Sequence, residues 1–126
     1  MLAGDFFFIT TLQQESGKIS AALEINADHK IFEGHFPGQP VVPGVCMMQM
    51  VKEILEAVLE QPLRLYTADN LKFLTVIDPV ETNTVQAVLK YTTAADESIQ
   101  VAATFLNDSV VYFKMNGVFR NEKMPA

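Results

Sequence analysis

The sequence is poor in cysteine and in basic residues, and it contains no long apolar run. Cys46 is the single cysteine of the 126 residues, so no disulfide can form within the chain, which fits a reducing compartment. Nine lysines and arginines stand against 15 aspartates and glutamates, which leaves a net charge of −6. An acidic chain is a poor electrostatic match for nucleic acid or an anionic membrane surface, so neither is an expected partner. The longest apolar runs, at 6–9 and 45–48, are far too short to span a membrane.

The start of the sequence gives no sign of export. No basic residue precedes Asp5 and no small-residue cleavage site follows it, so no secretory signal is predicted and the cytoplasm is the expected compartment. Hydrophobic residues make up 49% of the chain and charged residues 19%, a composition that excludes disorder. At this length we expect a single domain over residues 1–126, whose last few residues form a flexible tail.

Alternating apolar and polar residues predict a mainly antiparallel sheet. The alternation is clearest where Ile19, Leu23 and Ile25 share one face of a short segment. Residues 107–109 predict a hairpin between the last two strands. Strands are expected at 6–13, 19–25, 70–76, 84–91, 98–106 and 110–120.

A long helix is predicted from Pro43 to about Glu60. Proline is tolerated in a first helical turn, because its missing N–H would lack an intrahelical partner there. From Val45 to Val51 every residue except Gln49 is apolar, so the first two turns are expected to be buried on nearly all sides. The predicted fold is α+β, with a curved antiparallel sheet wrapped around this central helix. The second half of the helix is expected to carry solvated charges at Lys52, Glu53, Glu56 and Glu60.

Residues 34–44 are the segment best suited to chemistry. Their sequence, Gly-His-Phe-Pro-Gly-Gln-Pro-Val-Val-Pro-Gly, specifies a stiff and particular backbone path. One interpretation is a rigid connection in which His35 is a hydrogen-bonded structural histidine. In the other, the loop delivers His35 to the helix N-terminus, whose free N–H groups and positive dipole end stabilise developing negative charge. A base beside such a site, in an apolar enclosure, suits proton abstraction next to a carbonyl.

The run from Gly34 to Val45, followed by a helix with a polar residue at position 49, resembles the 3-hydroxyacyl-acyl-carrier-protein dehydratases of fatty acid synthesis. The match is dense and specific over residues 33–50. A looser similarity continues through Leu71-Lys72-Phe73 and Asp78-Pro79. This family has the hotdog fold, in which a curved antiparallel sheet wraps a long helix, and the resemblance implies that fold for most of the chain.

The resemblance also implies a role for several residues. His35 is similar to the catalytic histidine that takes a proton from C2 of the 3-hydroxyacyl thioester. Gly44 is similar to the glycine whose backbone N–H holds the thioester carbonyl as it becomes enolate-like. Residues that contact substrate or fix the loop geometry are implied as well, at Phe36, Pro37, Pro40, Pro43 and Val45.

Position 49 departs from the family pattern. The family has an acidic residue fourteen positions after the histidine, supplied by the other subunit of a dimer, whereas this sequence has Gln49. A carboxylic acid protonates the departing hydroxyl, but an amide only hydrogen-bonds to it, and losing a general acid costs about 10²–10⁴ in rate. The nearly isosteric exchange Gln49→Glu is therefore expected to restore the donor. If Gln49 is structural instead, its amide satisfies a nearby backbone group.

Other side chains near the motif have a structural and a functional interpretation. Glu53, one helical turn further along, is either an ordinary solvated charge or a replacement acid. Glu33 is a candidate to orient His35 or to hold a proton for it. Cys46 is either a buried, inert thiol or a thiol whose pKa is lowered by the helix N-terminus. His29, in a polar turn, is expected at the surface.

The function that the resemblance implies is the elimination of water from a (3R)-hydroxyacyl thioester to give the trans-2-enoyl thioester. Two alternatives stay open: a hotdog acyl thioesterase, and a non-catalytic acyl-binding protein or heterodimer partner that carries Gln49 in place of the acid. No cofactor is expected, and no cluster of His, Cys or carboxylate residues has metal-ligand spacing.

The expected partners are the carrier of the thioester, either acyl carrier protein or coenzyme A, and a second copy of the chain. The family arrangement places the site in a dimer interface, so a homodimer or a larger assembly of dimers is expected. An acidic carrier needs a local basic patch for docking despite the net charge of −6. The candidates for this patch are Lys30, Arg64, Lys72 and Arg120.

Overall fold

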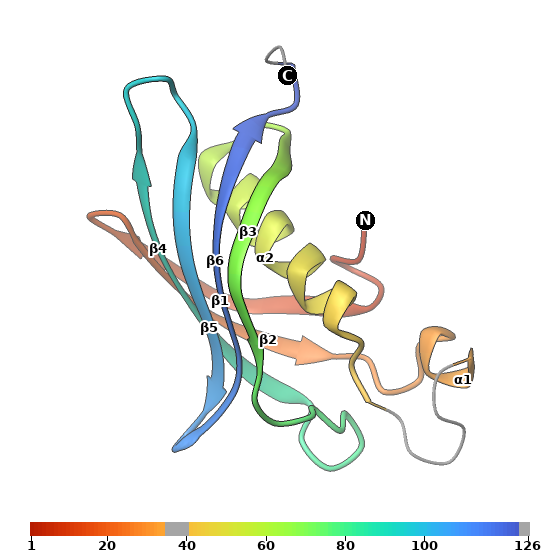
Figure 1. The fold of residues 1–126 in the computed structure, drawn as a ribbon. Helices are drawn as coiled ribbons and strands as arrows, with labels where there is room; N and C mark the ends of the chain where they lie inside the picture. Colours follow the sequence, from red (N-terminus) through yellow and green to blue (C-terminus); the bar gives the residue numbers. More distant parts are fainter. Residues whose placement is uncertain (35–40, 124–126) are drawn as a thin grey trace.

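The fold is one antiparallel sheet with a long helix lying across one of its faces (Figure 1). The computed structural model describes residues 1–34 and 41–123; the predicted C-terminal tail at 124–126 lies outside the described residues. Six strands form the sheet in the order β1-β2-β4-β5-β6-β3, so that β1 and β3 are its two edges. In chain order the elements are β1 (Phe7–Glu15), β2 (Lys18–Ile25), α1 (Ile31–Gly34), α2 (Gly44–Leu59), β3 (Leu63–Phe73), β4 (Thr84–Thr93), β5 (Ile99–Asn107) and β6 (Val110–Asn121).

The predicted alternation is confirmed where one face of a strand is buried. In β2, Ile19, Leu23 and Ile25 are each at most 1% exposed and face the helix side of the sheet. The hairpin predicted at 107–109 joins β5 to β6, with Asn107 opposite Val110. These features follow from the sequence, because a half-buried strand must repeat every two residues.

The bounds predicted for the strand at 70–76 are wrong, since β3 runs from Leu63 to Phe73. Its register with β6 shifts between Leu65 and Thr67 and again between Asp69 and Lys72. Each irregularity inserts residues into one strand, so the side-chain period of two is interrupted. The first half of β3 therefore shows no alternation that a sequence pattern could reveal.

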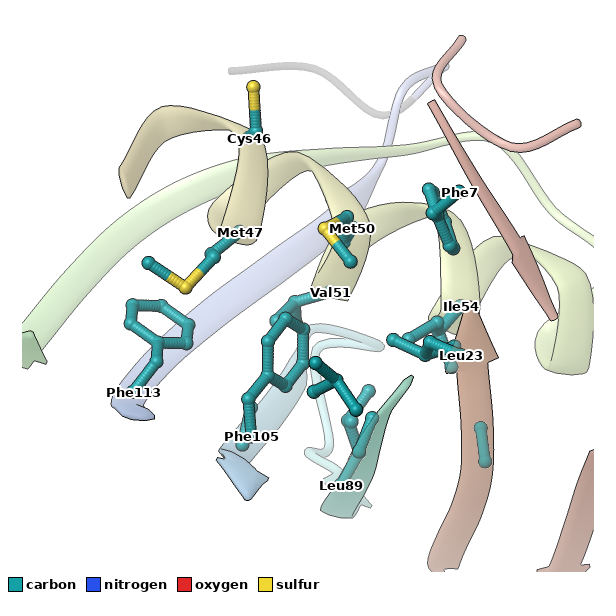
Figure 2. Close-up of a cluster of buried hydrophobic side chains, with 14 of the residues drawn as sticks. Phe7, Leu23, Cys46, Met47, Met50, Val51, Ile54, Leu89, Phe105 and Phe113 are labelled. Atoms are coloured by element: carbon teal, nitrogen blue, oxygen red, sulfur yellow. The ribbon is translucent and has the colours of Figure 1, made fainter. Parts of the chain in front are cut away.

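Helix α2 supplies the second layer of the core, and its bounds agree closely with the predicted helix. Met50, Val51 and Ile54 have no exposed surface, and each such side chain contributes roughly 1.5–3 kcal/mol by leaving water. Figure 2 shows Val51 beside Phe105 and Ile54 beside Leu23, both of which come from the sheet, with Met47 one turn earlier beside Phe113. The helix ends where Glu60 takes a left-handed conformation, with φ of 54°. Among the described residues, no helix is long and apolar enough to cross a membrane.

The expectation that the first two turns of α2 are buried on nearly all sides is wrong for this single chain. Val45 is 74% exposed, and Met48 and Gln49 are half-buried. One side of the helix packs on the sheet, and at the start of the helix this other side is only partly covered by the described part of the chain. The start of α2 therefore presents apolar surface to whatever lies next to it.

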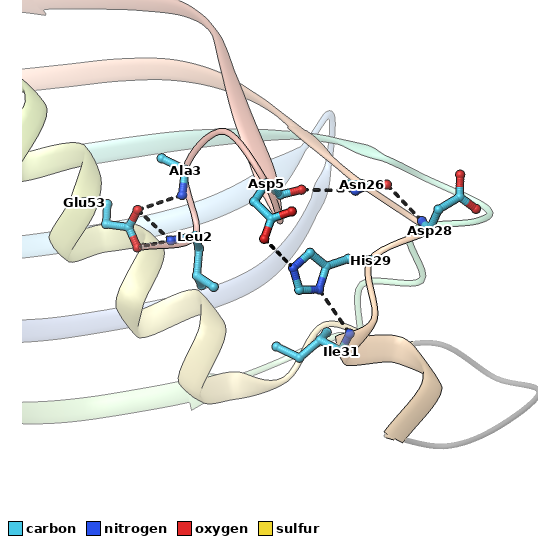
Figure 3. A network of polar contacts seen from close by, with 8 residues as sticks. All are labelled: Leu2, Ala3, Asp5, Asn26, Asp28, His29, Ile31 and Glu53. Atoms are coloured by element: carbon cyan, nitrogen blue, oxygen red, sulfur yellow. Dashed lines mark hydrogen bonds and ion pairs between the residues drawn. The ribbon is translucent and has the colours of Figure 1, made fainter.

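His29 is half-buried and organises the turn before α1, contrary to the expectation that it lies at the surface. Its Nδ1 accepts the backbone N–H of Ile31 at 3.0 Å, and its Nε2 lies 3.0 Å from Oδ2 of Asp5 (Figure 3). Because Nδ1 is an acceptor, Nε2 carries the proton and donates to the carboxylate. The ring also meets Phe6 edge-on, with 5.3 Å between centroids. His29 thus fixes α1 against the start of β1.

Candidate functional site

The chain enters α2 through a short segment that is tied to the residues after β3. The N–H of Val42, which is buried, donates to the carbonyl of Ile77 at 2.9 Å. Pro43 precedes the helix and makes no side-chain capping bond. The first N–H groups of an α-helix have no partner within the helix, and they form its positive dipole end. This end of α2 can therefore stabilise negative charge on a bound carbonyl oxygen.

Gly44 starts α2 in close contact with Phe73, the last residue of β3. A Cβ atom on Gly44 would lie 2.7 Å from Cε1 of the Phe73 ring, closer than side-chain atoms pack. Phe73 in turn stacks on Phe113, with 5.2 Å between the ring centroids. Glycine at this position lets the aromatic pair approach the helix backbone, so the end of β3 and the start of α2 form one corner.

Gln49 and Glu53 form a hydrogen-bonded pair one turn apart on α2. Nε2 of Gln49 donates to Oε2 of Glu53 at 2.8 Å. The same carboxylate accepts the backbone N–H of Leu2 on both oxygens, at 3.0 and 2.8 Å, and that of Ala3 on Oε1, at 2.7 Å. Figure 3 shows Glu53 reaching from α2 to the N-terminal segment. Three donors from two distant parts of the chain therefore converge on one carboxylate.

The expectation that Glu53 is a solvated charge is wrong, because the residue is only 2% exposed. A buried carboxylate is stable when N–H donors compensate its charge, and Leu2, Ala3 and Gln49 do so here. Protonation would turn one acceptor oxygen into a donor that faces N–H groups. The arrangement therefore suits an anchor and does not suit a replacement acid. No sequence pattern could reveal it, since two of the donors are backbone groups about fifty residues away.

The remaining candidates on the helix side are Val45, Cys46 and Glu33. Val45 follows Gly44 and is exposed at the start of α2. Cys46 is buried, and this burial raises the pKa of its thiol, which favours the inert thiol over the reactive one. Glu33 is exposed on α1. Within the part of the chain that the structure describes, no group of three or more His, Cys, Asp or Glu residues could hold a metal ion.

The loop half of the predicted site lies outside the described residues. It comprises the predicted catalytic histidine, His35, together with Phe36, Pro37 and Pro40. The structure accordingly gives the geometry of the helix half alone. The roles of these four loop residues, and the role of Glu33 toward His35, stay predictions.

A six-stranded antiparallel sheet around one long helix defines the hotdog fold, and solved structures of that fold share this arrangement. The dehydratase heterocomplex ApeI:P from Xenorhabdus doucetiae contains a chain that matches with a TM-score of 0.69, over 90% of this chain and 97% of that one, at 18% identity. An uncharacterized protein from Erwinia carotovora subsp. atroseptica matches with a TM-score of 0.64, over 90% of this chain and 92% of that one, at 24% identity. At these identities the likeness shows the fold alone.

This chain belongs to the ApeI-like family, whose model, described as ApeI dehydratase, matches residues 11–114. The 3-hydroxyacyl-[acyl-carrier-protein] dehydratase FabZ of Rickettsia africae is 28% identical over 79 residues, or 56% of this chain and 54% of that protein. FabZ of Rhizorhabdus wittichii is 28% identical over 67 residues, or 53% of this chain and 43% of that protein. The matches thus span about half the length of these relatives. They confirm the family resemblance inferred from residues 33–50.

Replacing the buried carboxylate should test its anchoring role. We expect Glu53→Met to lower the free energy of unfolding by about 3 kcal/mol, because it leaves three N–H donors without their charged acceptor. Glu56→Met is the matched control, since Glu56 accepts a single N–H, from Leu63 at 2.8 Å, and should cost about 1 kcal/mol. Urea denaturation of both variants measures the difference. Equal losses would contradict the anchoring role.

Proposed function

We propose that the protein eliminates water from a (3R)-hydroxyacyl thioester to give the trans-2-enoyl thioester. The match of a dehydratase family model to residues 11–114 carries this proposal, because that range includes the histidine motif and the helix that follows it. The FabZ relatives are named for 3-hydroxyacyl chains on acyl carrier protein, so a thioester of that carrier or of coenzyme A is the proposed substrate. We place the reaction in the cytoplasm, where the lone Cys46 stays reduced.

In this proposal the start of α2 binds the thioester carbonyl. The N–H of Gly44 and the dipole of α2 stabilise the negative charge that develops on the carbonyl oxygen when C2 loses a proton. His35 is the base that takes this proton. The corner formed by Gly44, Phe73 and Phe113 supplies apolar walls, in which a hydrogen bond to the oxygen is stronger than in water.

The proton balance of this reaction can be met without an acid at position 49. His35 removes the C2 proton and becomes an imidazolium, and the C3–O bond breaks as the C2–C3 double bond forms. The imidazolium then gives its proton to the leaving hydroxyl, which departs as water. Gln49 contributes a hydrogen bond to that hydroxyl. Without a second proton donor, we expect turnover slower by about 10²–10⁴ than a site with a carboxylic acid would give.

The test is an assay of the purified protein with a 3-hydroxyacyl thioester, scored for both enoyl product and free acid. We expect enoyl product from the native chain, and a loss of about 10²–10⁴-fold in His35→Ala, because the base is removed. Circular dichroism and thermal unfolding should show that the variant stays folded. Near-normal turnover in this variant would remove His35 from the mechanism. Free acid in place of enoyl product would identify a thioesterase, and binding without either product a non-catalytic acyl-binding protein.

We further propose that a second copy of the chain pairs along the β3 edge. An edge strand presents unpaired N–H and C=O groups, and large exposed apolar patches on a soluble domain mark interfaces. Val45, at 74% exposure, would add to this surface from the start of α2. A dimer formed here would bring the second chain next to the candidate site. The exposed apolar side chains of β3 and the segment after it are Tyr66, Leu71, Phe73, Leu74 and Val76.

Light scattering at micromolar concentration should therefore give a mass of about twice the 14.0 kDa of one chain. The combined variant Leu71→Lys and Val76→Lys should give monomers, because it places charges in the apolar interface. Val110→Lys is the control, since Val110 is 42% exposed at the hairpin between β5 and β6, away from this edge. A native chain that is monomeric and inactive, but gains activity with a second hotdog chain, would favour a heterodimer.

For the carrier, we propose docking at Lys72 and Lys114, at the end of β3 that is next to Phe73. These two lysines are direct cross-strand partners and share a hollow of about 410 Å³. Like charges directly opposite each other destabilise a sheet, and neither lysine has an ion pair within the described residues. An acidic carrier would relieve this repulsion, and it would bind on the outer face of the sheet, one residue along β3 from Phe73, whose ring contacts Gly44.

The other predicted basic residues do not form part of the same patch. Arg64 and Arg120 are cross-strand partners at the opposite end of β3, roughly 20 Å from the Lys72–Lys114 pair at the usual rise per residue along β6. Arg120 is already engaged, because it lies over the Tyr66 ring, 3.9 Å from the centroid, and its Nη2 is 3.7 Å from Oδ2 of Asp96. Lys30 precedes α1 and is exposed.

The combined variant Lys72→Glu and Lys114→Glu should raise KM by about tenfold for a substrate on acyl carrier protein, equivalent to 1.4 kcal/mol of binding. With the same acyl chain on coenzyme A, KM and kcat should stay unchanged, because the small carrier makes no contact with this surface. Lys90→Glu, on the same face of the sheet but two strands from Lys114, is the control. A similar rise for both substrates would contradict docking at this pair.

A further inference from the structure

The side-chain amide of Gln49 is held in one orientation by Glu53. A carboxylate accepts hydrogen bonds and donates none, so only the NH2 end of the amide can face Oε2 of Glu53 at 2.8 Å. Glu53 cannot turn away without losing the N–H groups of Leu2 and Ala3. The carbonyl oxygen, Oε1, is therefore the free end of the Gln49 side chain, and no described residue donates a hydrogen bond to it.

We propose that Glu53 is a positioning residue, which makes Gln49 an acceptor for the 3-hydroxyl group of the substrate. This inference deepens the dehydration proposed above and rests on it. The hydroxyl would donate to Oε1 of Gln49, and its own lone pairs would stay available for the proton that completes the leaving water. In this site the residue at position 49 orients the hydroxyl and does not protonate it.

Glu53 also changes what a carboxyl group at position 49 can do. Two carboxyl groups within hydrogen-bond distance share one proton, because both cannot ionise at low cost. The carboxyl introduced by Gln49→Glu would accordingly donate its proton to Glu53, which the N–H groups of Leu2 and Ala3 hold in place. The sequence suggests that Gln49→Glu alone restores the acid. In this structure, however, the proton of the new carboxyl goes to Glu53 and does not reach the substrate.

Exchanging both residues avoids this competition. In the combined variant Gln49→Glu and Glu53→Gln, the amide oxygen at position 53 accepts the N–H groups of Leu2 and Ala3. Its NH2 group takes the place of Oε2 and donates to the carboxyl at position 49, so of the four native hydrogen bonds to residue 53 only the second one from Leu2, to Oε2, is lost. The carboxyl at position 49 then has no carboxylate one turn away, and its proton is free for the leaving hydroxyl.

Few other charges bear on this pair. Glu56, one turn further along α2, is engaged with the N–H of Leu63. Lys52 is half-buried on the same helix, and on the N-terminal segment Asp5 is engaged with His29. The ion pairs His29–Asp5 and Arg120–Asp96 do not involve position 49 or 53. Protonation of the pair is therefore governed mainly by the two side chains themselves.

The kinetic test compares dehydration by the native chain, both single variants and the combined variant across pH. We expect Gln49→Glu to stay within about threefold of the native rate, and the combined variant to be at least about tenfold faster than Gln49→Glu, or 1.4 kcal/mol in barrier. The kcat of the combined variant should fall at high pH, where the new acid loses its proton. With a merely structural role for Glu53, Gln49→Glu alone would show the same limb and the same rate. Equal rates for Gln49→Glu and the combined variant would overturn the proposal.

A carboxyl titration followed by ¹³C NMR decides the proposal independently of turnover. In Gln49→Glu the pair should titrate in two steps, one displaced well above the ordinary pKa of glutamate, whereas the combined variant should show no such step. Two ordinary titrations in Gln49→Glu would overturn the positioning role, even if the combined variant did not fold. If no protein in the series dehydrates the substrate, the proposed function fails, and the titration still decides whether Glu53 holds residue 49.

Discussion

One helix must close the whole inner face of a six-stranded sheet, and the rest of the structure depends on that constraint. Val51 meets Phe105 and Ile54 meets Leu23 across the two layers (Figure 2), and none of these side chains keeps any exposed surface. Because the sheet has no second helix on this face in the described chain, α2 must lie centrally along it. Its N-terminus is thereby brought against the end of β3, where Gly44 admits the Phe73 ring.

The same packing leaves α2 with two unlike sides, and the candidate site develops along their boundary. The sheet side is apolar, whereas the other side combines exposed Val45 with the polar pair of Gln49 and Glu53. Glu53 is an exception in a core of hydrocarbon, and its burial is tolerated because the N-terminal segment supplies N–H groups to it. Hydrophobic packing sets the position of the helix, and this carboxylate sets which atoms of Gln49 face outward.

Much of this fold is predictable from the sequence, because its dominant signals are local. The buried face of β2 repeats every two residues, and α2 contains an apolar run that begins next to a proline, so both were expected close to their observed bounds. The bulges of β3 interrupt its period of two and hide the start of the strand.

The candidate site is less predictable than the fold. Gln49 is identifiable by its position in the motif, but its partner is not, since Glu53 is buried by backbone groups from the far end of the chain. His29 is mistaken for a surface residue for the same reason, because its partner Asp5 is distant in sequence.

The charge of Glu53 is compensated largely by backbone N–H groups, so this compensation does not depend on which side chains the donor residues carry. Leu2 and Ala3 contribute N–H groups, which every amino acid except proline supplies. Substitutions at these two positions can alter packing without leaving the carboxylate unsatisfied, so long as proline is avoided. The side chains of the N-terminal segment can therefore vary, whereas the path of its backbone cannot. The only side chains that the hydrogen-bonded cluster requires are those of Gln49 and Glu53 on α2.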